Sequence, residues 1–282
     1  MSTYKKITIH CDRKNSERLY NYLYLFDIDT ILEEDSKYVF YITKNFKKPV
    51  KELISFIKKN IPNIKVKIEN FTNIDWVKKW ESSIKPIYIR DKIVIYPSWQ
   101  KKKIKDKKNL IKIEIDPKMS FGTGHNETTQ MVLDMMIDYI SPNDKFLLDF
   151  GTGSGILAIA AAKLGVREII AIDNDEVAIK NAYENIIKNR VSKKLTLLLS
   201  TIDSIKFSRF DVIIANITSD VIKKYFKHIY SKLKSNGKLI LSGITKKEKN
   251  NFILFLKRKK MLVKEIKSKN DWVIIYCIKE SI

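Results

Sequence analysis

The sequence predicts an α/β protein in which helices cover both faces of a mostly parallel sheet, preceded by a small α+β domain. In the second half of the chain, apolar runs of strand length alternate with helical patterns, as in successive β-α-β units. One complete unit lies at 146–175, where apolar runs at 146–148 and 169–172 flank an alanine-rich helix. Residues 1–72 follow a different order of strands and helices, which predicts a separate domain.

The β-α-β unit carries a glycine turn between its first strand and its helix. Gly151, Gly153 and Gly155 let the backbone approach a ligand closely, and the N–H groups of the next helix face that ligand. Asp173 ends the second strand, where an acid suits a ribose diol. A dinucleotide fingerprint needs glycine at the position that Ile156 occupies. The turn therefore predicts either another nucleotide-type ligand or an ordinary tight turn.

Length and composition are those of a globular protein. At 282 residues, 44% of them hydrophobic, the chain can bury a core for one large or two smaller domains. It has no apolar run long enough to span a bilayer, and its amino terminus is polar, without an apolar signal core. Cys11 and Cys277 have no metal-ligand neighbours. We therefore expect a soluble cytoplasmic protein without a metal site.

The formal net charge of +22 has two interpretations. It suits an anionic partner such as a ribosome. However, only seven of the 54 basic residues are arginine, the residue best suited to bidentate phosphate contacts. An excess of Lys, Ile and Asn with little Arg and Gly is typical of AT-rich codon usage. We weigh codon bias above selected binding and expect at most weak proximity to ribosomal RNA.

The first 72 residues predict a ferredoxin-like domain, because their elements follow the order β-α-β-β-α-β. A connector at 73–85 carries Trp76 and Trp80 four residues apart, and we expect these side chains to pack the connector against a domain. The expected elements are strand 5–11, helix 16–26, strands 28–33 and 38–43, helix 49–59 and strand 64–68.

The remaining chain supplies the large sheet and its helices. Asn216 ends a buried run at the carboxyl edge of that sheet, in the same pocket as Gly151 and Asp173. The expected elements are a hairpin at 87–96, a solvated loop at 101–108, strand 111–115, a helix ending near 140, strand 146–148, helix 156–163, strand 169–172, helix 176–188, strands 195–199 and 210–217, helix 220–233, a turn at 234–237, strand 238–242, helix 246–259, and an antiparallel pair at 263–267 and 272–278.

Three motifs resemble those of a known family. The pattern D-x-G-x-G-x-G at 149–155 resembles motif I of class I S-adenosylmethionine-dependent methyltransferases. The hallmark F-G-T-G-x-x-x-T-T matches 121–129, and Trp80 with 97–99 matches a Trp…Pro-Ser-Trp segment. The chain thus resembles the ribosomal protein L11 methyltransferase family (PrmA type). Many members read T-H-P where this chain has His-Asn-Glu at 125–127, which argues against a catalytic histidine there.

The resemblance implies a fold and a domain plan. The fold is an α/β, class I methyltransferase (Rossmann-like) seven-stranded sheet with helices on both faces, plus the ferredoxin-like domain. Residues 1–72 would recognise the substrate, 73–85 would be the linker, and 86–282 would be the methyltransferase domain.

The resemblance also implies the chemistry. The cofactor would be S-adenosyl-L-methionine, with S-adenosyl-L-homocysteine as product and no metal. Thr129, Gly151, Gly153 and Asp173 would contact the cofactor, and Asn216 would be both a cofactor contact and the catalytic residue beside the transferable methyl. The substrate would be ribosomal protein L11, free or on the large subunit, methylated on lysine ε-amines and the terminal α-amine. We expect a monomer.

Two other functions stay open from the sequence alone. A class I methyltransferase acting on RNA would also suit the small α+β domain and the charge of +22. A non-catalytic module that binds the cofactor and acts through protein contacts is the second alternative. Intact Asp149, Asp173 and Asn216 argue against that loss of activity.

Overall fold

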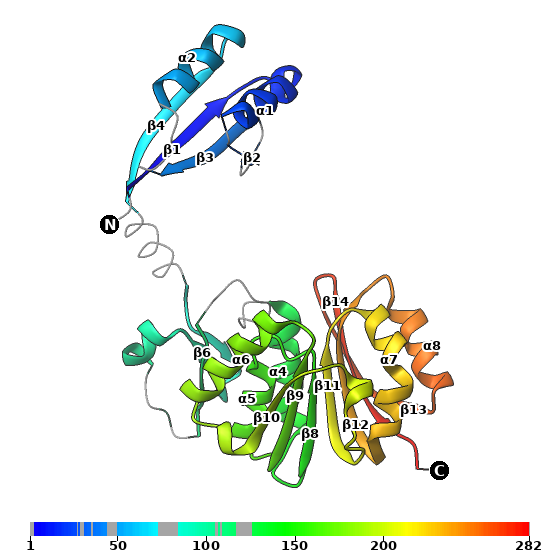
Figure 1. Ribbon diagram of the computed structural model, residues 1–282. Helices are drawn as coiled ribbons and strands as arrows, with labels where there is room; N and C mark the ends of the chain where they lie inside the picture. The colour runs from blue at the N-terminus through cyan, green and yellow to red at the C-terminus, as the bar shows by residue number, and fades with distance from the viewer. Residues whose placement is uncertain are drawn as a thin grey trace. The chain divides into compact units, whose positions relative to one another are not determined.

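The chain divides into two compact units, Met1–Ile84 and Lys85–Ile282. They are seen in a computed structural model, which describes residues 3–26, 28, 31–34, 36–43, 50–72, 84–104, 107, 109–116 and 126–281. The connector tryptophans Trp76 and Trp80, and residues 121–125 of the family hallmark, lie outside the described residues. Figure 1 shows the two units, which are described separately below.

The first unit is a four-stranded antiparallel sheet with two helices. Its strand order is β2-β3-β1-β4, the ferredoxin-like arrangement that the element order predicts. Alternation along β1 buries Ile7 and Ile9, and the helices add Leu23 and Leu53 to the same core. The elements are β1 (Thr3–His10), α1 (Ser16–Leu25), β2 (Leu32–Glu34), β3 (Lys37–Thr43), α2 (Val50–Asn60) and β4 (Lys65–Thr72).

The second unit is built on a mixed seven-stranded sheet. The order is β10-β9-β8-β11-β12-β14-β13, with β14 antiparallel to both of its neighbours. This confirms the predicted methyltransferase sheet and its closing antiparallel pair. The strands are β8 (Phe146–Phe150), β9 (Glu168–Asp173), β10 (Leu195–Leu199), β11 (Phe210–Asn216), β12 (Leu233–Thr245), β13 (Met261–Lys269) and β14 (Trp272–Lys279).

Helices cover both faces of this sheet (Figure 1). One apolar core lies under α4, α5 and α6, and a second lies under α7 and α8. Helix α5 is apolar on every side and is buried on every side, because it packs between the large sheet and a smaller one. The helices are α4 (Glu127–Tyr139), α5 (Ile156–Lys163), α6 (Glu176–Lys188), α7 (Ser219–Lys232) and α8 (Lys249–Arg258).

A small sheet of β5 (Ile87–Ile89), β6 (Ile93–Tyr96) and β7 (Ile111–Glu114) completes the unit. Its buried isoleucines join the core of α4 and α5. Among the described helices, none has the length and apolar character needed to cross a membrane.

Three local predictions differ in detail from the structure. The expected strand at 28–33 is observed as β2, from Leu32, and residues 29 and 30 lie outside the described residues. The expected solvated loop begins with a 3₁₀ turn at Ser98–Lys103, whose lysines at 101–103 are exposed, and the Lys101 Nζ lies 2.7 Å from a Glu114 carboxylate oxygen. The expected turn at 234–237 lies within β12 at a register shift, where Asn236 has a φ of +59° and the pairing with β11 passes from Leu233 to Lys238.

Candidate functional site

A pocket of about 540 Å³ lies where the parallel strands of the second unit end. Open α/β sheets bind ligands at this carboxyl edge. The glycine turn after β8, Asp173 at the end of β9 and Asn216 at the end of β11 all line the pocket. Residues at the ends of three neighbouring strands therefore meet in one cavity.

The glycine turn is held against the neighbouring strand by its own backbone. The N–H groups of Gly151 and Thr152 both donate to the Ile172 carbonyl at 2.9 Å. Gly151 has a φ of +78°, and a Cβ there would lie 2.4 Å from Cγ2 of Ile217. Only glycine fits this position without displacing the loop after β11, so the two loops define each other.

Asp149 ties the turn to helix α5 from within the core. One carboxylate oxygen accepts from the Thr152 hydroxyl at 2.7 Å and from the Ala158 N–H at 3.1 Å. The other carboxylate oxygen is buried without a partner among the described residues. Burial raises the pKa of Asp149 to about 6. The residue therefore shapes the turn from behind and does not line the pocket.

Asp173 lines the pocket, and its carboxylate can accept more hydrogen bonds than it makes with the protein. One carboxylate oxygen accepts from the Gly153 N–H at 2.9 Å, and the other accepts from the Asp175 N–H at 3.1 Å. An ionised carboxylate offers about four lone-pair sites. Two backbone bonds therefore orient this side chain and leave it able to accept the hydrogen bonds of a diol.

Asn216 presents a carbonyl oxygen beside the turn. Its amide nitrogen donates to the Thr129 hydroxyl at 3.3 Å, which holds the amide in one orientation. Its carbonyl oxygen is buried, with no partner among the described residues. A buried acceptor without a partner is unfavourable until a ligand donates to it.

The loop that follows Asn216 is braced from the far side. Ser219 donates to a carboxylate oxygen of Glu248, whose other oxygen accepts from the backbone and hydroxyl of Thr245 at 2.9 and 2.6 Å. These hydrogen bonds lower the pKa of Glu248 to about 2. A Cβ on Gly243 would lie 2.2 Å from the Ile217 carbonyl oxygen. The loop is thus fixed against β12 at both places.

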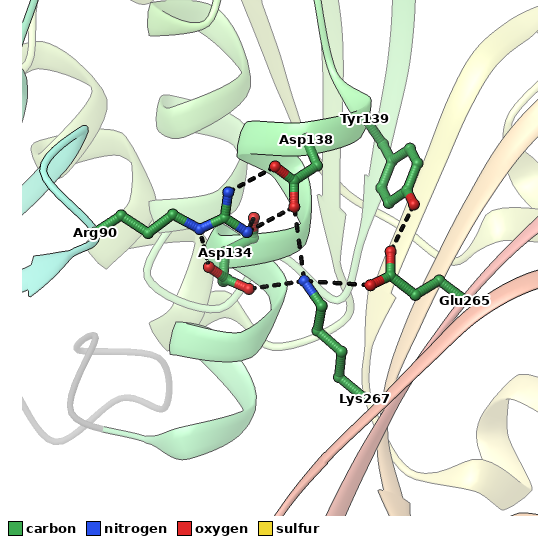
Figure 2. A network of polar contacts seen from close by, with 6 residues as sticks. All are labelled: Arg90, Asp134, Asp138, Tyr139, Glu265 and Lys267. Carbon is green, nitrogen blue, oxygen red and sulfur yellow. Dashed lines mark hydrogen bonds and ion pairs between the residues drawn. The ribbon is translucent and has the colours of Figure 1, made fainter.

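A charged network holds helix α4, whose first turn reaches the pocket (Figure 2). The Arg90 guanidinium lies 2.6 Å from carboxylate oxygens of Asp134 and Asp138, one helical turn apart on α4. Lys267 from β13 lies 3.0 Å from Asp134. Tyr139 donates to Glu265, also on β13, at 2.5 Å. The helix is therefore clamped between the small sheet and the edge of the large one.

The predicted site residues are brought together, with one difference in placement. Gly151, Gly153, Asp173 and Asn216 line the pocket. Thr129 is 1% exposed and lies behind Asn216. Its neighbour in the first turn of α4, Thr128, lines the pocket in its place.

Sequence reasoning missed several pocket walls. Ser200 and Thr201 follow β10, and their place at a strand end is a signal that could have identified them. Tyr225 in the middle of α7 and Trp272 at the start of β14 also line the pocket. No local pattern marks these two residues, since only tertiary packing brings them to this edge.

The pocket suits a nucleoside with a polar tail. Gly151 provides a surface without a side chain, Asp173 can accept from a diol, and Asn216 offers an acceptor without a partner. Among the described residues, no group of three or more His, Cys, Asp or Glu could hold a metal ion.

Comparisons with known proteins agree with this geometry. The profile of the family "Ribosomal protein L11 methyltransferase (PrmA)" matches residues 3–280. A ribosomal protein L11 methyltransferase of Listeria welshimeri is 35% identical over 233 residues, covering 76% of this chain and 73% of that protein. One of Listeria monocytogenes serotype 4b is 34% identical over 247 residues, covering 85% and 77%.

A solved structure shows the same fold. The crystal structure of the ribosomal protein L11 methylase of Lactobacillus delbrueckii subsp. bulgaricus is 26% identical, with a TM-score of 0.64. The match covers 70% of this chain and all of that one. The chain belongs to the ribosomal protein L11 methyltransferase (PrmA) family of S-adenosylmethionine-dependent methyltransferases.

Proposed function

We propose that this protein transfers methyl groups from S-adenosylmethionine to amino groups of ribosomal protein L11. The family match supports the substrate, because the family and its listeria relatives are named for it. The observation that carries the chemistry is Asn216, which lines the pocket of the glycine turn and whose buried carbonyl oxygen has no partner among the described residues. Such a substrate would place the reaction in the cytoplasm.

Backbone and side-chain groups of the turn would hold the cofactor. Gly151 and Gly153 would lie against its methionine portion, and Asp173 would accept from the ribose hydroxyls. Thr129 would act through Asn216, whose amide it orients. When bound, S-adenosylmethionine supplies a methyl group that its sulfonium already activates, so no metal is required.

The acceptor amine must reach the pocket uncharged. Lysine has an unperturbed pKa of about 10.4, and removal from water favours its neutral form. Among the described residues that line the pocket, the one carboxylate is Asp173, which two backbone N–H groups engage. We assign no general base. The Asn216 carbonyl would instead accept an amine N–H and so point the nitrogen lone pair at the methyl group.

Apolar walls would exclude water from the reaction. Phe150 and Tyr225 meet edge to face with ring centroids 5.8 Å apart, and Ile217, Val221 and Trp272 also line the pocket. A dry wall strengthens the Asn216 hydrogen bond and hinders reprotonation of the amine.

Residues 1–72 would recognise the protein substrate. The unit that contains them has its own core, and the pocket is lined by residues of the second unit. The first unit is thus available for binding the substrate, with 73–85 as linker and 86–282 as the catalytic domain.

One experiment tests the activity against both alternatives. The protein is incubated with labelled S-adenosylmethionine and, separately, with free ribosomal protein L11, large ribosomal subunits and bare ribosomal RNA. We expect label in the protein, and mass spectrometry then identifies the amines and the number of methyl groups on each. Label in the RNA alone would reassign the protein as an RNA methyltransferase. Tight cofactor binding without any transfer would make it a non-catalytic module.

A further inference from the structure

A second groove, of about 600 Å³, lies at the opposite edge of the seven-stranded sheet. It is lined where β8, β9, β10 and β11 begin, by residues that include Phe146, Glu168, Leu195 and Phe210. Parallel strands all begin at one edge and end at the other, so this groove is separate from the cofactor pocket. No step of the proposed methyl transfer uses it.

The groove is basic, and its charge includes arginine. Arg167, Lys193 and Lys194 all line it. The side chain of Arg167 is 75% exposed. Three of the seven arginines in the chain, at 167, 190 and 209, lie on the loops that enter β9, β10 and β11. Of these three, Arg167 lines the groove, and arginine is the residue best suited to phosphate.

Two acids at this edge are engaged by lysines that do not line the groove. The Lys238 Nζ lies 2.8 Å from a carboxylate oxygen of Asp144. Asp211 is paired with Lys234 and also accepts from the N–H groups of 145 and 146 at 3.0 and 2.8 Å. These pairs neutralise two carboxylates of the edge. Glu168 lines the groove itself and lies 3.6 Å from the Arg167 Nε, so the three cations of the lining, Arg167, Lys193 and Lys194, outnumber its one carboxylate.

An exposed aromatic ring stands beside these cations. Phe207 also lines the groove, is 36% exposed and lies between Lys206 and Arg209 in the sequence. Its ring centroid is 5.0 Å from that of Phe146 and 4.9 Å from that of Phe210, so two rings support it from behind. Proteins bind single-stranded nucleic acids with aromatic rings on which bases stack and with cations that pair with phosphates, and both kinds of side chain line this groove.

We propose that this groove binds a single-stranded segment of RNA. Arg167, Lys193 and Lys194 pair with phosphates, and a base stacks on Phe207. The choice of RNA over DNA rests on the proposed ribosomal substrate. The binding of a single strand in this groove is argued from its lining residues and does not depend on that substrate. The groove would hold the enzyme near ribosomal RNA while the pocket at the other edge stays open.

The charge part is tested by fluorescence anisotropy of a labelled 12-nucleotide single-stranded RNA, with the full chain and without cofactor or ribosomal protein. The double variant R167Q/K193Q should bind about 20-fold more weakly at 0.1 M salt, and its slope of log K against log salt should fall by about 1.4, because each phosphate contact contributes about 0.7. The matched control K257Q/R258Q changes the same charge on exposed residues of α8 and should stay within about twofold. Equal losses in both variants would mean general charge attraction and would overturn the site.

The stacking part is tested by Phe207→Leu, which keeps an apolar side chain against the two supporting rings. We expect binding to weaken at least about fivefold with an unchanged salt slope, since stacking is not a charge effect. Two results together would overturn the proposal, namely an unchanged RNA affinity in this variant and competition by heparin as strong as that by unlabelled RNA. They would mean that the groove binds any polyanion. Equal affinity for single-stranded DNA of the same sequence would overturn the choice of RNA.

Calorimetry with S-adenosylmethionine shows whether each variant is folded, because the cofactor pocket lies at the other edge. The RNA measurement needs no methyl transfer, and the labelling assay needs no RNA binding. The two proposals therefore fail separately.

Discussion

At the scale of single residues, two buried carboxyl or amide oxygens near the glycine turn have no partner among the described residues. Asn216 lines the pocket, whereas Asp149 is fully buried behind the turn. The first can gain a partner when a ligand enters the pocket, and the second cannot. A buried oxygen without a hydrogen-bond partner therefore predicts a catalytic role for Asn216 and a pH-dependent contribution to stability for Asp149.

Replacing Asn216 with alanine removes the acceptor that orients the amine. We expect kcat at saturating substrate to fall about 100-fold or more, as for loss of one preorganised polar group, with a small change in cofactor affinity. Thr129→Val leaves the carbonyl in place but removes the hydroxyl that holds the amide, and should lower kcat about tenfold. Steady-state kinetics with ribosomal protein L11 and calorimetry with the cofactor measure both. Unchanged turnover in Asn216→Ala would refute the assigned role.

Replacing Asp149 with asparagine should flatten the pH dependence of stability in acid. Burial raises the pKa of Asp149 from 3.8 to about 6, so between these values the folded state holds a proton that the unfolded state has released. Stability therefore falls as the pH rises through this window, by about 2 to 3 kcal/mol. The asparagine variant lacks this titration and should gain that amount relative to the natural chain between about pH 4 and pH 7. Urea unfolding measures the free energy of unfolding of both proteins across this pH range. Curves of free energy against pH that run parallel for the two proteins would contradict the prediction.

At the scale of elements, the site depends on how loops and helices are held, and the fixing residues come from distant parts of the chain. The loop after β11 is braced by Glu248 from beyond β12. Helix α4, which carries Thr128, is clamped by Arg90 and Lys267 (Figure 2).

Replacing Glu248 with alanine should loosen the loop after β11. Hydrogen bonds to a charged group contribute about 1.5 to 3 kcal/mol each before screening by solvent, and we expect a loss of about 2 kcal/mol at neutral pH. Because hydrogen bonds lower the pKa of Glu248 from 4.5 to about 2, this stabilisation is complete above the first value and disappears as the pH falls to the second. Denaturant unfolding at neutral pH and near pH 2.5 tests this. The exposed Glu280→Ala is the control, and an equal difference at both pH values would contradict the prediction.

The clamp on α4 is best measured by a double-mutant cycle between Arg90→Ala and Asp138→Ala. The Arg90 side chain is 40% exposed, which screens the pair, but its fork contacts two carboxylates. We expect a coupling free energy of about 1 kcal/mol from urea unfolding, larger than for an isolated surface pair in salt. The same cycle between Lys180 and Glu176, an exposed i,i+4 pair on α6, should give about 0.3 to 0.5 kcal/mol. Coupling near zero at Arg90 would mean that the network does not hold the helix.

At the scale of the whole molecule, the chain is built from two compact units, Met1–Ile84 and Lys85–Ile282. Each unit has a core of its own, so each can persist without the other. The basic groove adds a third surface on the second unit, away from the cofactor pocket.

A chain that begins at Lys85 should fold and bind S-adenosylmethionine with unchanged affinity, because the pocket residues and their supporting contacts lie in the second unit. It should lose at least about 100-fold in kcat/KM for ribosomal protein L11, since substrate contacts contribute to transition-state stabilisation. Circular dichroism, calorimetry and the labelling assay test the three statements. Retained methylation would refute the role of residues 1–72.

The order of the elements, the fold class and four pocket residues could be predicted from the sequence. Apolar periodicity sets the strands and helices, and the edge of a parallel sheet follows from their direction, so Gly151, Gly153, Asp173 and Asn216 had to meet. These are local signals, because each depends on neighbours within a few positions of the chain.

The tertiary structure alone decided which contacts form between residues that are far apart in the chain. Lys101 pairs with Glu114 from a turn that is otherwise exposed, and the expected turn at 234–237 coincides with the register shift where β12 pairs with β11. Tyr225 and Trp272 reached the pocket, and Phe207 joined the rings and cations of the groove, from elements that no sequence window contains together. Periodicity determines which face of an element is buried, but packing determines which side chains it meets. The sequence therefore determined the cofactor turn, and the fold decided what surrounds it.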